Sequence, residues 1–178
     1  MSSLSGALVR AALVSQLQAH AATGGVIEGA TVLPEPPESY DDLYGQSRGV
    51  LDLIWIDAYR ATGEITGFGS SGHVYTERAT HSLVVQVDRQ PGSWSMAAVD
   101  ARTDLVTEYV LGIILGDPSL GIDVQAEGLQ SIVVTPGSYE YRRRTLPTGG
   151  RTEKGHSAAY VLDVEVVASA KFTAPALP

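Results

Sequence analysis

The chain has 178 residues, of which 44% are hydrophobic and 18% are charged, and it contains no cysteine. This length is sufficient for one domain with its own hydrophobic core. The lack of cysteine excludes disulfides, thiolate catalysis and cysteine-based zinc sites within this sequence. No apolar run approaches the roughly 18 residues that a membrane-spanning helix needs, so we expect no membrane partner.

The formal net charge of −8 is unevenly distributed along the chain. Residues 1–141 carry 6 basic and 17 acidic side chains, a net charge of −11, and residues 155–178 carry −1. Residues 142–154, here called the basic segment, carry a net charge of +4. Its basic members are Arg142, Arg143, Arg144, Arg151 and Lys154. The acidic balance of the whole chain argues against nucleic acid as its main partner.

Two stretches with apolar residues at helical spacing predict two helices, residues 4–22 and 94–115. Ser93 or Ser95 can cap the second helix at its N-terminus. The expected buried stripe of the first helix includes Val9, Leu13 and Leu17. The expected apolar face of the second comprises Ala98, Ala101, Leu105, Val106, Tyr109, Val110 and Ile113.

Residues 26–49 are rich in proline and acidic residues, which predicts an irregular arm. Tyr40 and Tyr44 are expected to dock this arm on the body of the protein, and a short strand is expected within 26–33. A plain surface loop is an equally good interpretation of the same segment.

Alternating apolar residues predict two long strands, 50–62 and 74–89, that form an antiparallel hairpin. The Gly- and Ser-rich segment 63–73 between them, which contains Phe68, is expected to be a long flexible tip. Simple alternation places the first strand's large side chains on one face: Leu51, Leu53, Trp55 and Tyr59.

Three more strands are expected, over residues 122–126, 129–144 and 157–172. A long loop, 145–156, connects the last two, and residues 173–178 form a tail. Because the strands are joined by hairpins, we expect an α+β fold. Its sheet is mainly antiparallel with two helices packed on one face, and residues 4–172 form one domain.

The sequence contains a candidate dinucleotide-binding motif and four histidines, but their neighbours or spacing do not fit a cofactor or metal site. Residues 67–72 match G-x-G-x-x-G, but a β-rich segment follows where a dinucleotide site needs a helix. The spacing of His20, His73, His81 and His156 does not match a metal site. We therefore predict no cofactor and no metal.

Two acidic residues, Asp52 and Asp57, interrupt an otherwise apolar strand. They are five positions apart and therefore face opposite sides of the sheet, which excludes a paired-carboxylate site. An ion pair with Arg60 or Arg78, or protection of an edge strand, is the better interpretation. Since no nucleophile motif is found either, we predict no catalytic residues and no enzymatic activity.

The basic segment has three interpretations: a phosphate site, a contact with an acidic protein surface, or a solvated loop. The rest of the chain is strongly acidic, so a head-to-tail contact between copies would be electrostatically self-complementary. Contact with DNA would be weak and sensitive to salt.

In the order, lengths and general composition of its elements, the chain resembles the tail terminator proteins of long-tailed bacteriophages. These are also called tail-completion or head–tail joining proteins. The resemblance covers residues 4–172. It rests on the helix LVRAALVSQLQAH, the strands GVLDLIWIDAYRATG and RATHSLVVQVDR, the helix SMAAVDARTDLVTEYVLGIIL and a final β-hairpin.

This resemblance implies a structural virion protein that is made in the host cytoplasm. It would form a homo-oligomeric ring, expected to be a hexamer, at the head-proximal end of the tail. The ring would cap the tail tube protein, end its polymerisation and join it to the head–neck connector, and DNA would pass through without specific binding. Candidate interface residues are Arg142, Arg143, Arg144, Arg151, Lys154, Phe68, Tyr40 and Tyr44.

Two alternatives remain open at this point. The chain could be another ring-forming component of the tail tube or neck, which also assembles from α+β subunits. It could instead be a small β-rich ligand-binding domain with Trp55 and Tyr59 lining its pocket. An enzyme ranks third.

Overall fold

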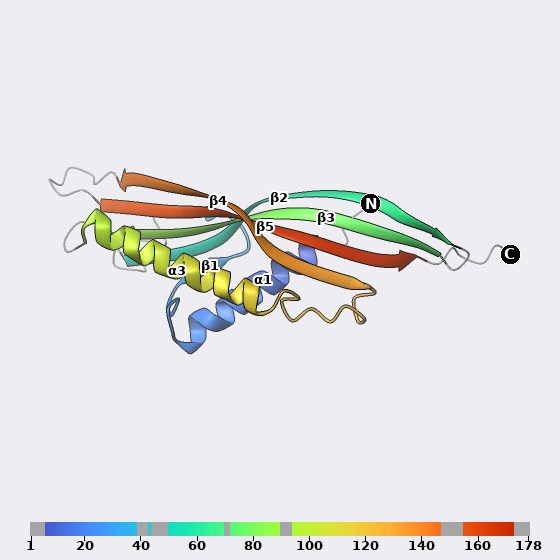
Figure 1. The fold of residues 1–178 in the computed structure, drawn as a ribbon. Helices are drawn as coiled ribbons and strands as arrows, with labels where there is room; N and C mark the ends of the chain where they lie inside the picture. Colours follow the sequence, from blue (N-terminus) through green and yellow to red (C-terminus); the bar gives the residue numbers. More distant parts are fainter. Residues whose placement is uncertain are drawn as a thin grey trace.

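The computed structural model describes residues 6–38, 43, 50–69, 72–89, 94–146 and 155–172. Within these residues the chain forms two helices and one five-stranded sheet, an α+β fold (Figure 1). The elements are α1 (Gly6–Thr23), β1 (Thr31–Leu33), β2 (Val50–Gly69), β3 (Gly72–Arg89), α3 (Met96–Gly116), β4 (Ser131–Leu146) and β5 (Gly155–Phe172).

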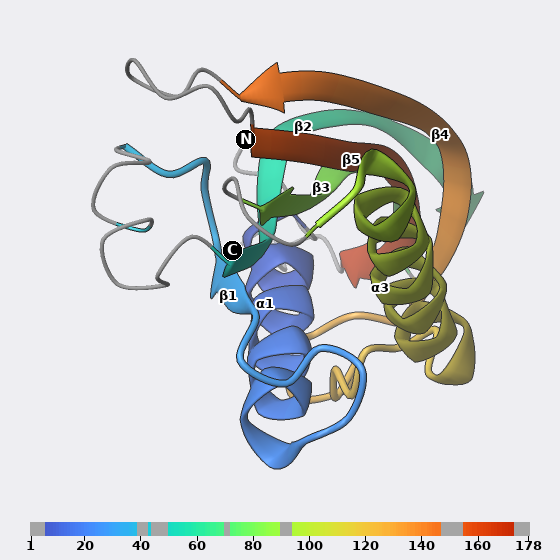
Figure 2. The same ribbon diagram turned by 90° about the vertical axis from the view of Figure 1, so that its left-hand side faces the viewer.

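The strands lie in the order β1-β2-β3-β5-β4. β1 runs parallel to β2, and every other neighbouring pair is antiparallel. Both helices lie on the inner side of the curved sheet, which confirms the predicted class and layering (Figure 2). We call the side of the sheet away from the helices the open face.

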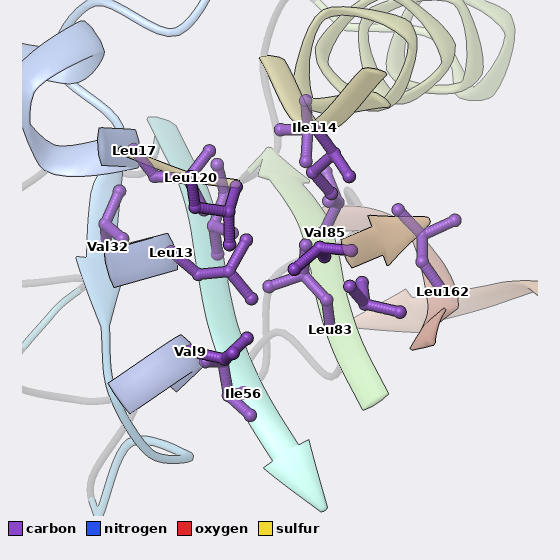
Figure 3. Close-up of a cluster of buried hydrophobic side chains, with 14 of the residues drawn as sticks. Val9, Leu13, Leu17, Val32, Ile56, Leu83, Val85, Ile114, Leu120 and Leu162 are labelled. Atoms are coloured by element: carbon purple, nitrogen blue, oxygen red, sulfur yellow. The ribbon is translucent and has the colours of Figure 1, made fainter. Parts of the chain in front are cut away.

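The main core lies between the helices and the sheet (Figure 3). The predicted stripe of α1 is confirmed, because Val9, Leu13 and Leu17 are buried against the sheet. Burial of one such side chain contributes about 1.5–3 kcal/mol. This stripe therefore attaches α1 firmly to the sheet.

Helix α3 begins as predicted but buries a different face. The Ser95 hydroxyl accepts a hydrogen bond from the Ala98 amide at 3.2 Å, which caps the N-terminus. Leu105, expected in the core, is 47% exposed. Arg102 reaches β2, where its Nε donates to Asp52 at 2.8 Å. The buried residues of α3 are Val99, Thr103, Val106, Thr107, Val110 and Ile114.

The prediction of a long flexible tip over residues 63–73 is wrong. β2 and β3 remain paired up to Gly69 and Gly72, with a second register shift between Ile65 and Gly67, so residues 63–69 are strand. Gly63 leaves room for the Tyr75 ring, because a Cβ atom at position 63 would lie 1.7 Å from the Tyr75 hydroxyl. The Gly-rich composition thus serves close packing within a strand.

A β-bulge at Asp57 changes which side chains share a face. The register shifts between Ile56 and Ala58, so alternation restarts after Asp57. Trp55 packs with Leu51, Leu53 and Val84 in a small cluster on the open face. Tyr59 packs against the main core on the other side. The prediction that Trp55 and Tyr59 share a face is therefore wrong.

The predicted arm contains the expected short strand, β1, in which Thr31 pairs with Leu53. The predicted strand over 122–126 is wrong, because this segment forms turns. The Asp123 carboxylate accepts hydrogen bonds from the amides of Gln125 and Ala126, at 3.1 and 3.2 Å, which favours a turn.

The final hairpin is longer than predicted. β4 continues to Leu146 and β5 begins at Gly155, so both ends of the expected loop 145–156 are strand. The pairing of Leu146 with Gly155 closes this ladder. The predicted tail, residues 173–178, lies outside the described residues.

Candidate interaction surfaces

The structure places Arg142 and Arg143, the two basic side chains of the basic segment that it describes, on two faces of β4. Arg142 points to the open face, where its Nε and Nη2 donate to Glu140 at 2.9 and 2.8 Å. This hydrogen bonding lowers the pKa of Glu140. Arg143 points to the helix side, where its Nη2 lies 2.5 Å from Oδ2 of Asp100. The two charged groups therefore have different carboxylate partners on different sides of β4, although both residues border the same depression.

The other candidate interface residues lie partly outside the described part of the chain. The backbone of Arg144 pairs with Ser157 and that of Phe68 with His73, but neither side chain is described. Tyr40, Tyr44, Arg151 and Lys154 lie outside the described residues altogether.

Arg142 borders a depression of about 370 Å³ on the open face. Trp55, Val84 and Asp57 also line it. Trp55 is buried and exposes little of its ring. This surface combines a shallow apolar floor with charges of both signs.

A second depression, of about 360 Å³, lies between α3 and the last two strands; we call it the tyrosine groove. Its lining residues are Asp104, Thr107, Glu108, Leu111, Tyr139, Tyr160 and Leu162. The Tyr160 hydroxyl donates to Asp104 at 2.8 Å. Burial, together with this carboxylate, raises the pKa of Tyr160 to about 12. Sequence analysis did not find this groove, although Asp100, Asp104 and Glu108 recur at every fourth position of the helix.

A buried ionic cluster joins three elements of the fold. Asp52 of β2 accepts hydrogen bonds from Arg89 at 2.7 Å and from Arg102 at 2.6 and 2.8 Å. Arg89 also lies over the Trp94 ring, 4.7 Å from its centroid. Asp52 therefore does not pair with Arg60 or Arg78, as the sequence had suggested, because α3 and the end of β3 supply closer arginines. Asp52 and Asp57 lie on opposite faces, as predicted.

His81 of β3 is buried on the helix side near Tyr59. The centroids of the two rings are 4.8 Å apart, and neither nitrogen of His81 has a hydrogen-bond partner in the described part of the chain. Burial and the positive charge of Arg10 lower the pKa of His81 to about 4, against the opposing effect of Glu77. His81 is thus neutral at physiological pH.

The β2–β3 hairpin and the end of β5 continue past both helices (Figure 1). We call this part, Arg60–Gly69 with its partners in β3 and β5, the distal end. Residues 60–65 are all exposed, and Ile65 exposes 55% of its surface. Val133 of β4 is also exposed. An extended sheet with exposed apolar side chains offers a surface for another protein chain.

The motif at residues 67–72 lies at the end of β2 and the beginning of β3, so a strand follows it, as predicted. Among the described residues, no group of three or more His, Asp or Glu side chains could hold a metal ion. Neither described helix is long and apolar enough to cross a membrane.

Comparison with models of known protein families found no match to this chain. A comparison with curated proteins found no match either.

Proposed function

We propose that the chain is a structural subunit that forms a homo-oligomeric ring at the head-proximal end of a bacteriophage tail. The ring, a hexamer in this proposal, caps the tail tube, ends its polymerisation and joins it to the head–neck connector. The observation that carries the proposal is the distal end, whose residues 60–65 are all exposed. A neighbouring subunit in a ring would cover such a surface.

The distribution of charge supports a head-to-tail arrangement. Arg142 lies on the open face of β4, whereas Asp104 and Glu108 line the tyrosine groove on the helix side. Complementary charges on opposite sides of one subunit favour heterologous contacts, which form rings where the rotation between subunits closes and filaments where it does not. They do not favour a two-fold dimer, in which the same patch would meet itself.

Another ring-forming component of the tail tube or neck is the second candidate. The exposed distal end supports this candidate equally well. The two candidates differ in how far the subunits assemble. A tube protein continues to polymerise into long tubes, whereas a terminator stops at one ring.

The ligand-binding alternative depended on Trp55 and Tyr59 lining the same pocket. The Asp57 bulge places Trp55 and Tyr59 on opposite faces, so the two rings cannot line one pocket. Tyr59 borders a depression of about 520 Å³ beside α1, whereas Trp55 borders the one of about 370 Å³ on the open face.

Negative-stain electron microscopy of the purified protein tests the proposal, alone and mixed with preformed tail tubes. We expect single rings in solution and density that closes one end of each tube. A stable monomer at high concentration that does not bind tubes would contradict the proposal. Long tubes of this chain alone would favour the tube-component alternative.

A further inference from the structure

We infer that the tyrosine groove is a receptor for a basic side chain, arginine or lysine, of a second copy of this chain. The identity of the occupant rests on the proposed function, because a ring places a second copy beside the groove. The affinity of the groove for a basic group is inferred from its aromatic rings, its carboxylates and one buried hydroxyl.

Tyrosine rings form one wall of the groove. The Tyr160 ring lies between Tyr139 and Tyr141, with centroid distances of 5.7 and 4.7 Å. Tyr139 is 70% exposed, the largest exposure among the large hydrophobic side chains described. An exposed aromatic ring beside carboxylates attracts a cation through the negative charge on its face. Arginine stacks well on such a ring.

Carboxylates of α3 form the other wall. Asp100, Asp104 and Glu108 follow one another at four-residue spacing, where like charges repel. Asp100 is paired with Arg143, and Asp104 accepts the Tyr160 hydroxyl, which is neutral. Glu108 is exposed and has no ion pair within the described residues. The groove thus retains negative charge that the described part of the chain does not neutralise.

A buried hydroxyl completes the site. Thr107 lines the groove and is only 5% exposed, yet its Oγ1 has no hydrogen-bond partner in the described part of the chain. Thr103, one turn earlier, donates its hydroxyl to the Val99 carbonyl at 2.7 Å. A buried polar atom normally has a partner. Because the atom itself is buried, a guanidinium or ammonium group reaches Thr107 Oγ1 only when the groove widens around it.

The charge distribution identifies a second copy as the occupant. Arg142 is 61% exposed and lies on the open face, so it cannot reach the groove of its own copy. Its pair with Glu140 is also exposed, and an exposed pair is exchanged for a new partner at little cost. In a head-to-tail contact, the open face of one copy meets the helix side of the next. Arg142 is therefore the first candidate for the inserted side chain.

Photo-cross-linking identifies the occupant directly. Because Tyr139 is exposed, it tolerates replacement by p-benzoylphenylalanine, and irradiation of assembled rings should join adjacent copies. We expect a cross-linked dimer, with mass spectrometry locating the link on the peptide that carries Arg142. Rings that give no cross-link, or a link only within one copy, would overturn the inference and leave the proposed function standing.

A charge-neutral variant measures the contribution of the groove to assembly. Asp104→Asn with Glu108→Gln removes both charges at almost unchanged size. We expect the protein concentration at which half of the chain is in rings to rise about tenfold. The matched control, Glu28→Gln with Glu127→Gln, removes two exposed charges outside the groove and should leave that concentration unchanged. Equal behaviour of the two double variants would overturn the inference.

If the wild-type chain forms no rings, the proposed function fails and the groove is tested alone. N-acetyl-arginine amide is then titrated into the monomer while the ring signals of Tyr139 and Tyr160 are followed by NMR. Saturable shifts that disappear in Asp104→Asn with Glu108→Gln would support the receptor for a basic group. No saturable shift would overturn it.

Discussion

The Asp52 carboxylate connects the sheet to helix α3 through Arg102. Arg102 Nε and Nη2 donate to Asp52 Oδ2 at 2.8 and 2.6 Å. The same Arg102 Nη2 donates to the Val26 carbonyl at 2.6 Å, which ties in the segment after α1. Arg89 occupies the other oxygen of Asp52 at 2.7 Å. One carboxylate thus pairs with two arginines, and Arg89 is almost fully buried.

Asp52→Asn leaves both arginines without their anionic partner. Removal of one member of a buried ionic cluster typically costs 3–5 kcal/mol, so we expect a loss of about 3 kcal/mol in the free energy of unfolding. Urea denaturation followed by circular dichroism measures this loss. Asp57→Asn is the control, because Asp57 is exposed and should change stability by no more than about 0.5 kcal/mol. Equal stability of the two variants would contradict this account of the cluster.

His81 should make the protein less stable in mild acid. Its pKa is about 4 in the folded state and 6.5 when unperturbed, so the unfolded chain binds the proton first as the pH falls. The contribution of neutral His81 to the free energy of unfolding is fully present above pH 6.5. It is lost as the pH falls toward 4. The shift corresponds to a loss of about 3 kcal/mol over this window.

His81→Leu removes this titration. The free energy of unfolding of the variant, measured by urea denaturation at pH 7 and pH 4.5, should therefore depend less on pH than that of the wild type. Thr103→Val is the control, since it changes a buried side chain that does not titrate, and it should keep the wild-type slope. An unchanged slope in His81→Leu would show that His81 does not titrate as described.

Deletion of Asp57 tests the bulge. Without this residue, Ile56 and Ala58 become neighbours opposite Leu83 and Ser82, so alternation keeps Tyr59 on the helix side. We expect a folded protein with native near-UV circular dichroism. Deletion of Ile54, which pairs with Val85 in the regular part of the ladder, should instead carry Trp55 to the helix side and give an insoluble or partly unfolded protein. An unfolded Asp57 deletion variant beside a folded Ile54 deletion variant would contradict the assigned register.

The two described arginines of β4 should differ in their effects. Arg143→Gln breaks the tie between β4 and Asp100 of α3, so it should lower the thermal midpoint of the isolated chain. Arg142→Gln removes only an exposed pair on β4 and should leave that midpoint unchanged. Its effect should appear in ring assembly, most strongly at low salt, where charge attraction is least screened. Identical behaviour of both variants in both assays would contradict their placement on opposite faces.

Local patterns in the sequence were enough to predict the class, both helices and most strand positions. The Val9, Leu13 and Leu17 stripe is a local periodicity, and it is confirmed. The bulge at Asp57 has no local signature, so alternation placed Tyr59 on the wrong face. The pairing of Asp52 with Arg102 spans 50 residues and depends on the rotation of α3. The tyrosine groove likewise combines α3 with β4 and β5, which only the three-dimensional arrangement brings together.

The central claim is that this chain assembles into one closed ring that caps a tail tube. Cryo-electron microscopy of the purified protein incubated with preformed tail tubes tests it most directly. The account predicts single rings in solution and one ring at the end of each tube, with the distal end of every subunit covered by a neighbour. A monomer that leaves the tube ends bare would contradict it.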